Sequence, residues 1–239
     1  MSKYLIKRAI IMAAGNGKRM RPLTLTTPKP LIKVNGVRMI ETVINALHAN
    51  NIYEIYVVVG YLKEQFKPLE SEFGIKLIEN PYFETCNNIS SLFVAREHLS
   101  DCIILDGDQI IYNSNILDPS FDISGYNATL VTEHTEEWVM TLKDGLVRSC
   151  SRTGGDEGWQ LFSVSRWNKE DGSKLKEFLE LEFIKNKNHD IYWDDIPMFL
   201  HFDSFNLGIH VMDKGDILEI DSLEELKKID SNYLKVKGV

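Results

Sequence analysis

Short, uniformly apolar segments alternate with apolar positions at helical spacing along the first 110 residues. Buried strands are predicted at 8–13, 54–60, 75–79 and 102–105, since each run is too short and too evenly apolar for a helix. Helical spacing recurs between these runs at Ile40, Val43, Ile44 and Leu47, then at Leu62, Phe66, Leu69 and Phe73, then at Ile89, Leu92, Phe93 and Arg96. Strands that alternate with helices indicate a parallel sheet with crossover helices.

Particular residues mark the ends of these elements. We expect Pro68 to break the second helix, Gly74 to end it, and the side chain of Asn88 to cap the third helix. Three prolines between 22 and 30 exclude a continuous helix after the first strand, so this stretch is predicted to be a structured loop. Ligands of parallel sheets bind at the carboxyl ends of the strands, where this loop lies.

The pattern changes after Tyr112. Four strands without intervening helices are predicted at 128–132, 138–142, 146–151 and 159–165. Helices are predicted over 175–183, near Asp194, and at the C-terminus through Leu223, Leu226, Ile229 and Tyr233. Because no linker composition separates the two halves, we expect the second half to be a mixed lobe fused to the same sheet.

Composition places the chain among globular proteins. Its 239 residues are 44% hydrophobic and 26% charged, which excludes disordered and collagen-like classes. No apolar run approaches the roughly 20 residues that span a bilayer, so we expect a cytoplasmic protein without a membrane partner. Three scattered cysteines without a CxxC pair predict neither a disulfide framework nor a structural zinc site.

Charge is distributed unevenly along the chain. The first 40 residues contain nine Lys or Arg and no Asp or Glu, whereas the net charge of the whole chain is −8. A small basic patch on an acidic body fits a localised anion site and argues against a nucleic-acid partner. The alternative is a solvated basic surface.

The richest candidate site is GNGKR at 15–19, directly after the first strand. Glycines allow backbone N–H groups to approach phosphates, and the neighbouring cations neutralise negative charge. The segment is not a P-loop, because Arg19 stands where Ser or Thr is required. It is not a dinucleotide fingerprint, because Met20 replaces the third glycine. For the two glycines alone, a tight turn without a ligand is the alternative.

Two pairs of alternating carboxylates are candidates for a metal site. Asp106 and Asp108 follow the fourth strand, and Glu219 and Asp221 precede the last helix. Alternate residues of an extended chain point the same way, and Mg²⁺ usually binds one or two carboxylates together with substrate phosphates. The alternatives are an Asp-Gly turn at 106–108 and helix capping by Asp221 or the next serine.

All four tryptophans lie in the second half, and two of them adjoin carboxylates. Trp138 follows Glu137, and Trp193 lies between Tyr192 and Asp194. Aromatic faces bind a quaternary ammonium with ~0.5–2 kcal/mol for each cation–π contact. Core packing is the alternative for each tryptophan. The histidines are dispersed and form neither an HxxxH motif nor a Ser/His/Asp arrangement that can be singled out.

The segments AAGNGKRMRPLT at 13–24 and PKPL at 28–31 resemble the signature of the nucleotidyltransferases that make NDP-sugars and CDP-alcohols. Over essentially its whole length the chain is similar to the bacterial CTP:phosphocholine cytidylyltransferases of the LicC type. The supporting segments are GYLKEQF at 60–66, NN at 87–88, SL at 91–92, DGD at 106–108, EW at 137–138, YWD at 192–194 and EIDS at 219–222.

The resemblance implies an α/β fold of the nucleotide-diphospho-sugar transferase type. This is a Rossmann-like mixed, mostly parallel sheet flanked by helices, with a smaller α+β acceptor lobe. We expect a single nucleotidyltransferase domain over 1–239. Within it, 1–112 would be the nucleotide-binding half, 113–215 the acceptor-binding lobe, and 216–239 the metal-ligand segment with the C-terminal helix.

The resemblance also implies roles for individual residues. Lys29 and Arg19 would be catalytic through contacts with the nucleotide phosphates, and Asp108, Asp221 and Glu219 would hold Mg²⁺. The nucleotide would be bound by Ala13, Ala14, Gly15, Asn16, Gly17, Lys18, Asn87, Asn88 and Gly107. The choline head would be surrounded by Glu137, Trp138, Tyr192, Trp193 and Asp194. Arg152, Trp159 and Arg166 match nothing in the family, so the group that binds the acceptor phosphate is unassigned.

These roles predict that an oxygen of phosphocholine attacks the α-phosphorus of CTP, giving CDP-choline and pyrophosphate. The partners would be these two small molecules, with Mg²⁺ as cofactor; no oligomeric state is predicted. Three alternatives stay open. One is the same chemistry on 2-aminoethylphosphonate or a sugar 1-phosphate, and another is a non-catalytic nucleotide-binding protein of the same fold. The third is a protein-interaction module, for which the sequence shows no exposed apolar stripe.

Overall fold

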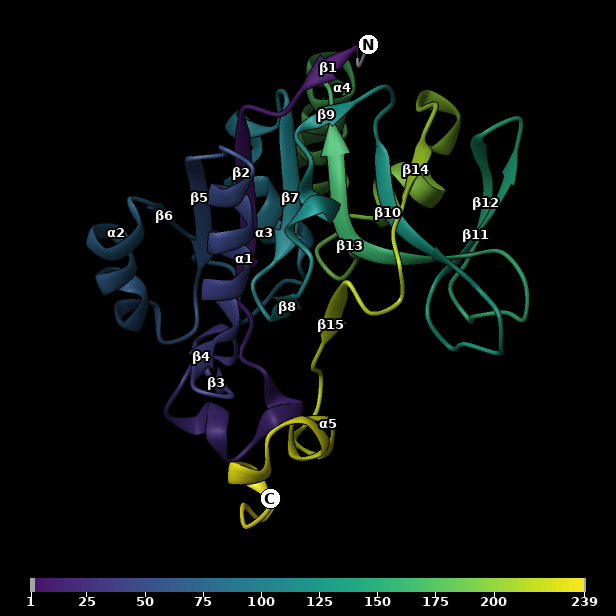
Figure 1. Cartoon of the computed structure of the whole chain (residues 1–239). Coiled ribbons are helices and arrows are strands. Elements are labelled where there is room, and N and C mark those ends of the chain that lie inside the picture. The colour runs from purple at the N-terminus through teal and green to yellow at the C-terminus, as the bar shows by residue number, and fades with distance from the viewer. Residues whose placement is uncertain (1–2, 239) are drawn as a thin grey trace.

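The computed structural model describes residues 3–238 and confirms the α/β class (Figure 1). Within these residues, the central sheet has nine strands in the order β12-β11-β13-β7-β2-β5-β6, with β10 beside β13 and β14 beside β10. The strands are β2 (Arg8–Ala13), β5 (Glu54–Val59), β6 (Lys76–Glu79), β7 (Cys102–Asp106), β10 (Gly125–Leu130), β11 (Val139–Lys143), β12 (Leu146–Ser151), β13 (Trp159–Trp167) and β14 (Gly208–Val211).

Helices and short strand pairs complete the fold. The α-helices are α1 (Met39–Ala49), α2 (Lys67–Phe73), α3 (Ile89–Val94), α4 (Lys169–Glu180) and α5 (Leu223–Ile229). The short pairs are β1 (Tyr4–Leu5) with β9 (Ser120–Phe121), β3 (Lys33–Val34) with β4 (Val37–Arg38), and β8 (Gln109–Ile111) with β15 (Ile217–Glu219).

The centre of the sheet is parallel, as the alternation of strands and helices predicts. Strands β7, β2, β5 and β6 run parallel in adjacent positions. Strand β13 joins them by antiparallel pairing with β7, so the second half of the chain extends the same sheet. The four strands predicted there correspond to β10–β13. The short strands β8, β14 and β15 were not predicted.

The residues of β2 show why its sequence is apolar after Arg8. Ala9 and Ile11 pack in a core with α1, whereas Ile10 and Met12 pack in a second core with α3 and α4. Successive residues of a strand point to opposite faces, so a strand covered by helices on both faces has no polar position.

Three predicted helix ends have different outcomes. Gly74 ends α2 in the left-handed conformation, with φ of 70°, as expected. The helix predicted over 62–73 is divided near Pro68, as expected: a 3-10 helix at Lys63–Phe66 precedes α2, and Pro68 lies in the first turn of α2, where its missing N–H removes no helical hydrogen bond. Asn88 makes no side-chain cap on α3; its Oδ1 accepts a hydrogen bond of 2.9 Å from the Trp193 N–H. Its own backbone is already helical, so the side chain is directed elsewhere.

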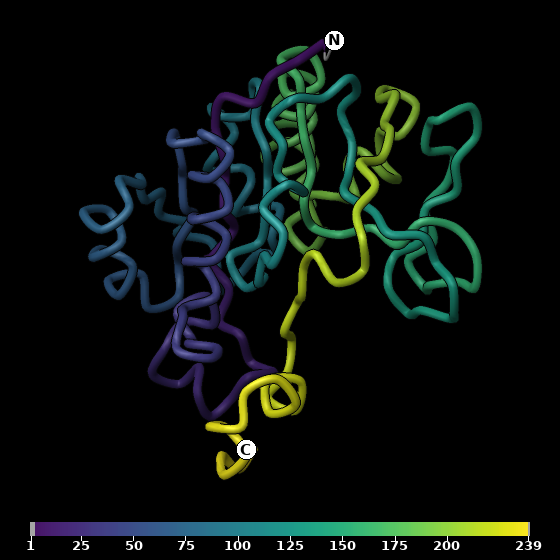
Figure 2. The backbone as a smooth tube through the Cα atoms, in the orientation of Figure 1, coloured from purple at the N-terminus to yellow at the C-terminus, as the bar shows by residue number. Residues whose placement is uncertain are grey.

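The N-terminal loop and the C-terminal segment lie side by side, as Figure 2 shows at the lower end of the molecule. Met20 and Ile32 share a small core with Ile220 and Leu226. The Tyr233 hydroxyl also donates a 2.6 Å hydrogen bond to the Lys33 carbonyl. The N-terminal loop and the C-terminal segment therefore pack against each other, although nearly the whole length of the sequence separates them.

Two observations bear on the predictions about membrane spans and disulfides. Within residues 3–238, no helix is both long and apolar enough to cross a membrane. The cysteines at 86, 102 and 150 are all free.

The close contact of α4 with the chain before β7 gives a stability prediction. A Cβ at Gly172 would lie 1.9 Å from the Leu99 carbonyl oxygen. We expect Gly172→Ala to destabilise the fold by about 1–3 kcal/mol, although alanine favours helices. Urea unfolding measures this change. Gly215→Ala is the matched control, because nothing lies within 4 Å of its added carbon. Equal stability of Gly172→Ala and the wild type would contradict the prediction.

Candidate active site

The loop after β2 folds back on itself. Gly17 adopts a left-handed conformation with φ of 56°, and a Cβ at this position would lie 2.9 Å from Thr24 Cγ2. The Thr24 hydroxyl donates a 2.8 Å hydrogen bond to the Gly17 carbonyl, and a 3-10 turn follows at Lys18–Met20. Glycine is therefore required at 17 both by conformation and by space.

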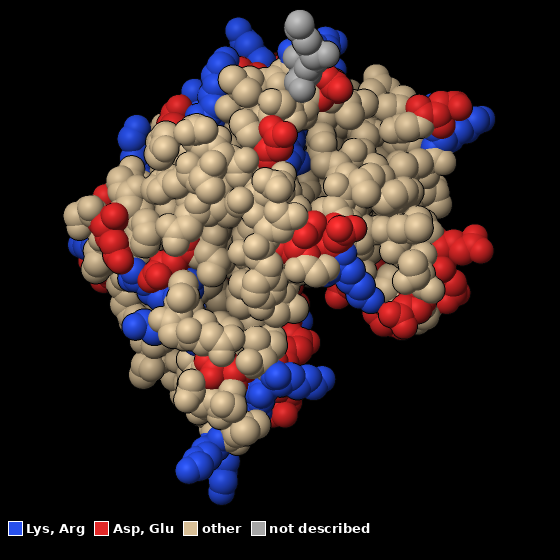
Figure 3. All heavy atoms as spheres, in the orientation of Figure 1, with Lys and Arg blue, Asp and Glu red and all other residues tan. Residues whose placement is uncertain are grey.

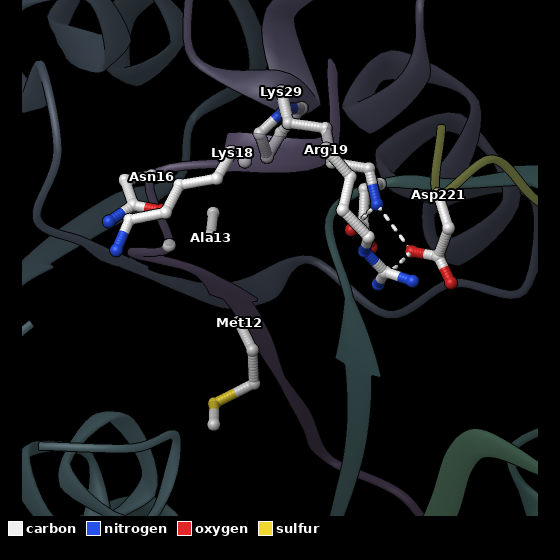
Figure 4. Close-up of a pocket in the computed structure, with 11 residues that line it drawn as sticks. Met12, Ala13, Asn16, Lys18, Arg19, Lys29 and Asp221 are labelled. Atoms are coloured by element: carbon white, nitrogen blue, oxygen red, sulfur yellow. Dashed lines mark hydrogen bonds and ion pairs between the residues drawn. The ribbon is translucent and has the colours of Figure 1, made fainter. Parts of the chain in front are cut away.

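Four charged side chains meet beside this loop. The Lys29 Nζ lies 2.5 Å from Asp108 Oδ2 and 2.8 Å from Asp221 Oδ1. Arg19 Nη2 lies 2.9 Å from the same Asp221 oxygen (Figure 4). The structure thus brings together residues from the N-terminal loop, the end of β7 and the segment before α5. Ser222 provides the cap of α5, so the Asp221 carboxylate faces Lys29 instead.

Burial and the neighbouring charges shift the pKa values of this cluster in opposite directions. Burial alone would lower the pKa of Lys29, whose side chain is 9% exposed, but Asp108 and Asp221 outweigh it and raise the pKa. Burial likewise opposes ionisation of Asp221, but Lys29 and Arg19 lower its pKa. Both Lys29 and Asp221 are therefore held in their charged forms at neutral pH.

A cavity of about 310 Å³ lies between the loop and these charges. In Figure 4 the side chains of Asn16 and Lys18 lie at one end of it, whereas Arg19 and Lys29 point toward Asp221. Its lining consists of Met12, Ala13, Gly15, Asn16, Gly17, Lys18, Arg19, Lys29, Pro30, Asp108 and Asp221. Glycine backbone and cations on one wall suit a polyphosphate.

A smaller cavity of about 190 Å³ adjoins the loop on the side of α3. It is lined by Ala14, Gly15, Asn16, Asn80, Phe83, Cys86, Asn87, Asn88, Ser90 and Ser91. Asn80, which sequence reasoning missed, is 1% exposed and donates 3.0 Å hydrogen bonds to the hydroxyls of Ser90 and Ser91. Amides and hydroxyls at fixed positions can recognise the polar edge of a base.

A third cavity, of about 340 Å³, lies on the other side of the charged cluster. It is lined by Arg19, Asn88, Asp106, Asp108, Glu137, Trp138, Leu161, Ser163, Tyr192, Asp194, Glu219 and Asp221. It shares Arg19, Asp108 and Asp221 with the first cavity, so the two meet at these charges. The rings of Trp138 and Tyr192 stand edge to face, with centroids 6.1 Å apart.

Two predicted contacts are wrong. Trp193 is 3% exposed and packs in the core, 6.0 Å from the Tyr126 ring, because it points away from the cavity that Tyr192 and Asp194 line. Gly107 lines neither of the two large cavities. Its N–H donates a 2.9 Å hydrogen bond to the Met12 carbonyl, so it allows close packing of the strand ends.

The third cavity is rich in carboxyl groups that resist ionisation. Burial raises the pKa of Asp194 to about 7, although the Tyr126 hydroxyl donates a 2.9 Å hydrogen bond to it. Burial also raises the pKa of Glu219 to about 7, despite a 2.7 Å hydrogen bond from Gln109 Nε2. The pKa of Asp106 is raised by burial and then by its acidic neighbours. A bound cation would favour the ionised forms.

The surface beside this cavity is acidic as well. Figure 3 shows acidic side chains gathered on the loops next to β11 and β12, and a notch between these loops and the C-terminal part. The exposed acids of the loops are Glu133, Glu136, Glu137, Asp156 and Glu157. Such a surface attracts a cationic ligand.

A metal ion fits this site only together with a substrate. Within residues 3–238, no group of three or more His, Cys, Asp or Glu side chains is arranged to hold one. Asp108 and Asp221 converge on Lys29, with Glu219 nearby. Two carboxylates are the donor set from which Mg²⁺ binds when phosphates and water complete its shell.

Comparison with known proteins agrees with this geometry. Residues 9–166 match the model of the MobA-like NTP transferase domain. The chain belongs to this family. It is therefore a nucleotidyltransferase, and its fold is that of the nucleotide-diphospho-sugar transferases.

Several sequence relatives of this MobA-like transferase match over nearly their full length. It is 39% identical to a 2-aminoethylphosphonate cytidylyltransferase of Lancefieldella rimae, over 95% of this chain and 93% of the relative. It is 30% identical to a choline-phosphate cytidylyltransferase of Streptococcus pneumoniae, over 93% of this chain and 96% of the relative. The solved structure of the CTP:phosphocholine cytidylyltransferase LicC from the same species has a TM-score of 0.85 and 30% identity, covering 94% of this chain and 98% of that one.

The raised pKa of Asp194 gives a prediction for the pH dependence of stability. The folded protein holds a proton on Asp194 up to about pH 7, whereas the unfolded chain loses it near the ordinary pKa of 3.8. Stability from this group therefore falls as pH rises through this window. We expect the stability of Asp194→Asn, relative to wild type, to increase between about pH 4 and pH 7. Urea unfolding at several pH values measures this.

Asp203→Asn is the matched control, because it removes an exposed carboxylate in the same way. A constant difference for Asp194→Asn over the same range would show that this carboxyl group is not perturbed.

Proposed function

We propose that this enzyme transfers CMP from CTP to an oxygen of a small phosphate or phosphonate acceptor that carries a cationic nitrogen. The acceptor oxygen forms a bond to the α-phosphorus as the bond to pyrophosphate breaks on the opposite side. The observation that carries the proposal is the meeting of two large cavities at Arg19, Asp108 and Asp221. One cavity suits a triphosphate and the other an acceptor, so the reacting groups would meet at the charged cluster.

Electrostatics provides most of the catalysis in this proposal. Both substrates are anions, and phosphoryl-type transfer depends mainly on positioning and charge stabilisation. Lys29 and Arg19 would bind the nucleotide phosphates and stabilise the charge that develops on them. An acceptor phosphate is already ionised at neutral pH, so no side chain has to remove a proton.

Mg²⁺ is the proposed cofactor. Asp108 and Asp221 would hold it, with Glu219 nearby, and it would supply positive charge to the triphosphate. Lys29 bridges these two carboxylates in the free protein, at 2.5 and 2.8 Å. Its ammonium group thus neutralises them until the substrate and metal bind.

The nucleotide would lie along the glycine loop. The backbone from Ala13 to Gly17, with Lys18, would contact the phosphates. The smaller cavity, lined by Asn80, Asn87 and Asn88, would receive the base. Its amide and hydroxyl groups, together with the cytidylyltransferase relatives, support CTP as the donor.

Phosphocholine is the acceptor that we propose. Trp138 and Tyr192 line the third cavity with their rings at 88° to each other, and Glu137 and Asp194 lie beside them. Aromatic rings attract a quaternary ammonium that cannot donate hydrogen bonds. The similarity to LicC supports this choice.

2-Aminoethylphosphonate is the second candidate. Its primary ammonium donates hydrogen bonds, and the same cavity offers the carboxyl groups of Asp106, Glu137, Asp194 and Glu219. Trp193 was predicted to surround a choline head but is buried in the core, which also favours 2-aminoethylphosphonate. The 39% identity to the relative from Lancefieldella rimae favours it as well.

An acceptor panel tests the proposed function. Pyrophosphate release from CTP is measured in parallel with phosphocholine, 2-aminoethylphosphonate and glucose 1-phosphate, with and without Mg²⁺. We expect metal-dependent release with a cationic acceptor and none with the sugar phosphate. If no pyrophosphate is released with any acceptor and any nucleotide, the result would support the non-catalytic alternative.

The two cationic acceptors respond differently to loss of one ring. We expect Trp138→Leu to raise the KM for phosphocholine about tenfold, since a desolvated cation–π contact contributes about 1–2 kcal/mol. The KM for 2-aminoethylphosphonate should change much less, because hydrogen bonds hold its ammonium group. Steady-state kinetics with both acceptors measures the ratio. An equal effect on both KM values would contradict the assignment of Trp138 to the methylated head.

Loss of the central cation should abolish most turnover. We expect Lys29→Met to lower kcat at least about 100-fold, because no other group replaces its charge at the α-phosphate. The exposed Lys33→Met is the matched control and should retain the wild-type kcat. Near-normal turnover of Lys29→Met at saturating substrates would exclude the catalytic role.

A further inference from the structure

Arg152, which the sequence pattern left unassigned, lies against the aromatic wall of the acceptor cavity. It follows β12, and its guanidinium carbon is 3.8 Å from the centroid of the Phe199 ring and 5.7 Å from that of Trp138. The Phe199 ring also meets Trp138 edge to face, at 5.3 Å. Arg152 and Phe199 therefore form the support on which the Trp138 indole rests.

The same arginine is connected to the second aromatic wall. Its Nη2 forms an ion pair with Asp195 Oδ1, and the side chain of Asp195 is 7% exposed. The other oxygen of Asp195 accepts a 2.9 Å hydrogen bond from the Tyr192 N–H. One guanidinium group thus fixes the backbone of Tyr192 through Asp195 and the ring of Trp138 through direct packing.

Arg152 does not line either large cavity. One nitrogen of its guanidinium pairs with Asp195 and the guanidinium carbon lies against the two rings, while half of the side chain is exposed. A planar guanidinium can pair with a carboxylate and stack on an aromatic face at the same time, which a lysine ammonium cannot do equally well. The chemistry of this position therefore requires arginine in particular.

We propose that Arg152 is a positioning residue that holds Trp138 and Tyr192 at the separation that the cationic head of the acceptor requires. The inference rests on the proposed function. According to this inference, Arg152 lies outside the cavity but affects the affinity for the acceptor. It does not affect the affinity for the nucleotide or the turnover rate. None of the residues that Arg152 contacts lines the nucleotide cavity. Replacement of Arg152 should therefore weaken binding of the acceptor without weakening binding of the nucleotide.

Steady-state kinetics of Arg152→Met tests the proposal with phosphocholine and 2-aminoethylphosphonate. We expect the KM for the better acceptor to rise about tenfold, while the KM for CTP stays within about twofold of the wild type. Arg152→Lys should recover part of the loss, because it restores the charge beside Asp195 but not the stacking. Arg148→Met is the matched control, because Arg148 is an exposed arginine on the preceding strand, β12.

A second variant separates positioning from folding. Removing Arg152 alone leaves the Asp195 charge buried without a partner, which can destabilise the protein. Arg152→Gln combined with Asp195→Asn removes both charges, and the melting temperature of each variant is measured. We expect the double variant to fold like the wild type and still bind the acceptor more weakly.

The outcomes distinguish this inference from the proposed function. An unchanged acceptor KM in a folded Arg152 variant, or equal rises in the KM for CTP and acceptor, overturns the positioning role. Calorimetry measures the acceptor Kd without turnover. If the wild-type protein binds an acceptor but releases no pyrophosphate, only the proposed function is overturned. The acceptor Kd of the Arg152 variants then decides the role of Arg152. A wild-type protein that binds neither acceptor overturns both.

Discussion

One buried ammonium group holds the N-terminal loop, the end of β7 and the segment before α5 together at the candidate active site. Lys29 Nζ is within 2.8 Å of carboxylates from Asp108 and Asp221, and almost none of its side chain meets solvent. A buried charge without a partner is strongly unfavourable, and so are two facing carboxylates without a cation. Each of the three groups is therefore tolerated because the others are present. The glycine loop, the end of β7 and the segment before α5 must come together for this balance to exist.

The sheet topology delivers the two carboxylates to the same place. Strand β15 pairs with β8 in a register that sets Glu219 opposite Gln109, so the two acid pairs lie side by side. The carboxyl groups farther from Lys29 have no such neutralising partner. Their raised pKa values, near 7 for Asp194 and Glu219, are the electrostatic result of burying several acids in one cavity. The structure thus places a neutralised cluster beside an acidic cavity whose lining cation, Arg19, is paired with Asp221.

The sequence was most informative where one local rule decides the structure. The uniformly apolar strand at 8–13 and the helix end at Gly74 follow from burial on two faces and from the freedom of glycine. It was least informative where distant segments compete for the same side chain. Asn88 has a typical capping residue's chemistry, but the backbone of Trp193 is a partner that no local pattern reveals.

The same limit applies to the candidate site. The basic loop and the acid pairs were identified from residue types at strand ends, and they do converge. Trp193 was misassigned because the turn at 192–195 directs its ring into the core, and the sequence does not say which side chain of a turn faces inward. Asn80 and Arg152 belong to no motif that the sequence reveals. Asn80 is positioned by hydrogen bonds and Arg152 by stacking, and both interactions form only in the folded chain.

The packing of the N-terminal loop against residues 217–233 has a consequence for biosynthesis. The ribosome produces the loop well before its partners Ile220, Leu223 and Leu226. A nascent chain therefore exposes Met20 and Ile32 and carries Lys29 with an incomplete set of counter-charges until residues 217–233 have been synthesised. The charged cluster can form only after this segment has left the ribosome.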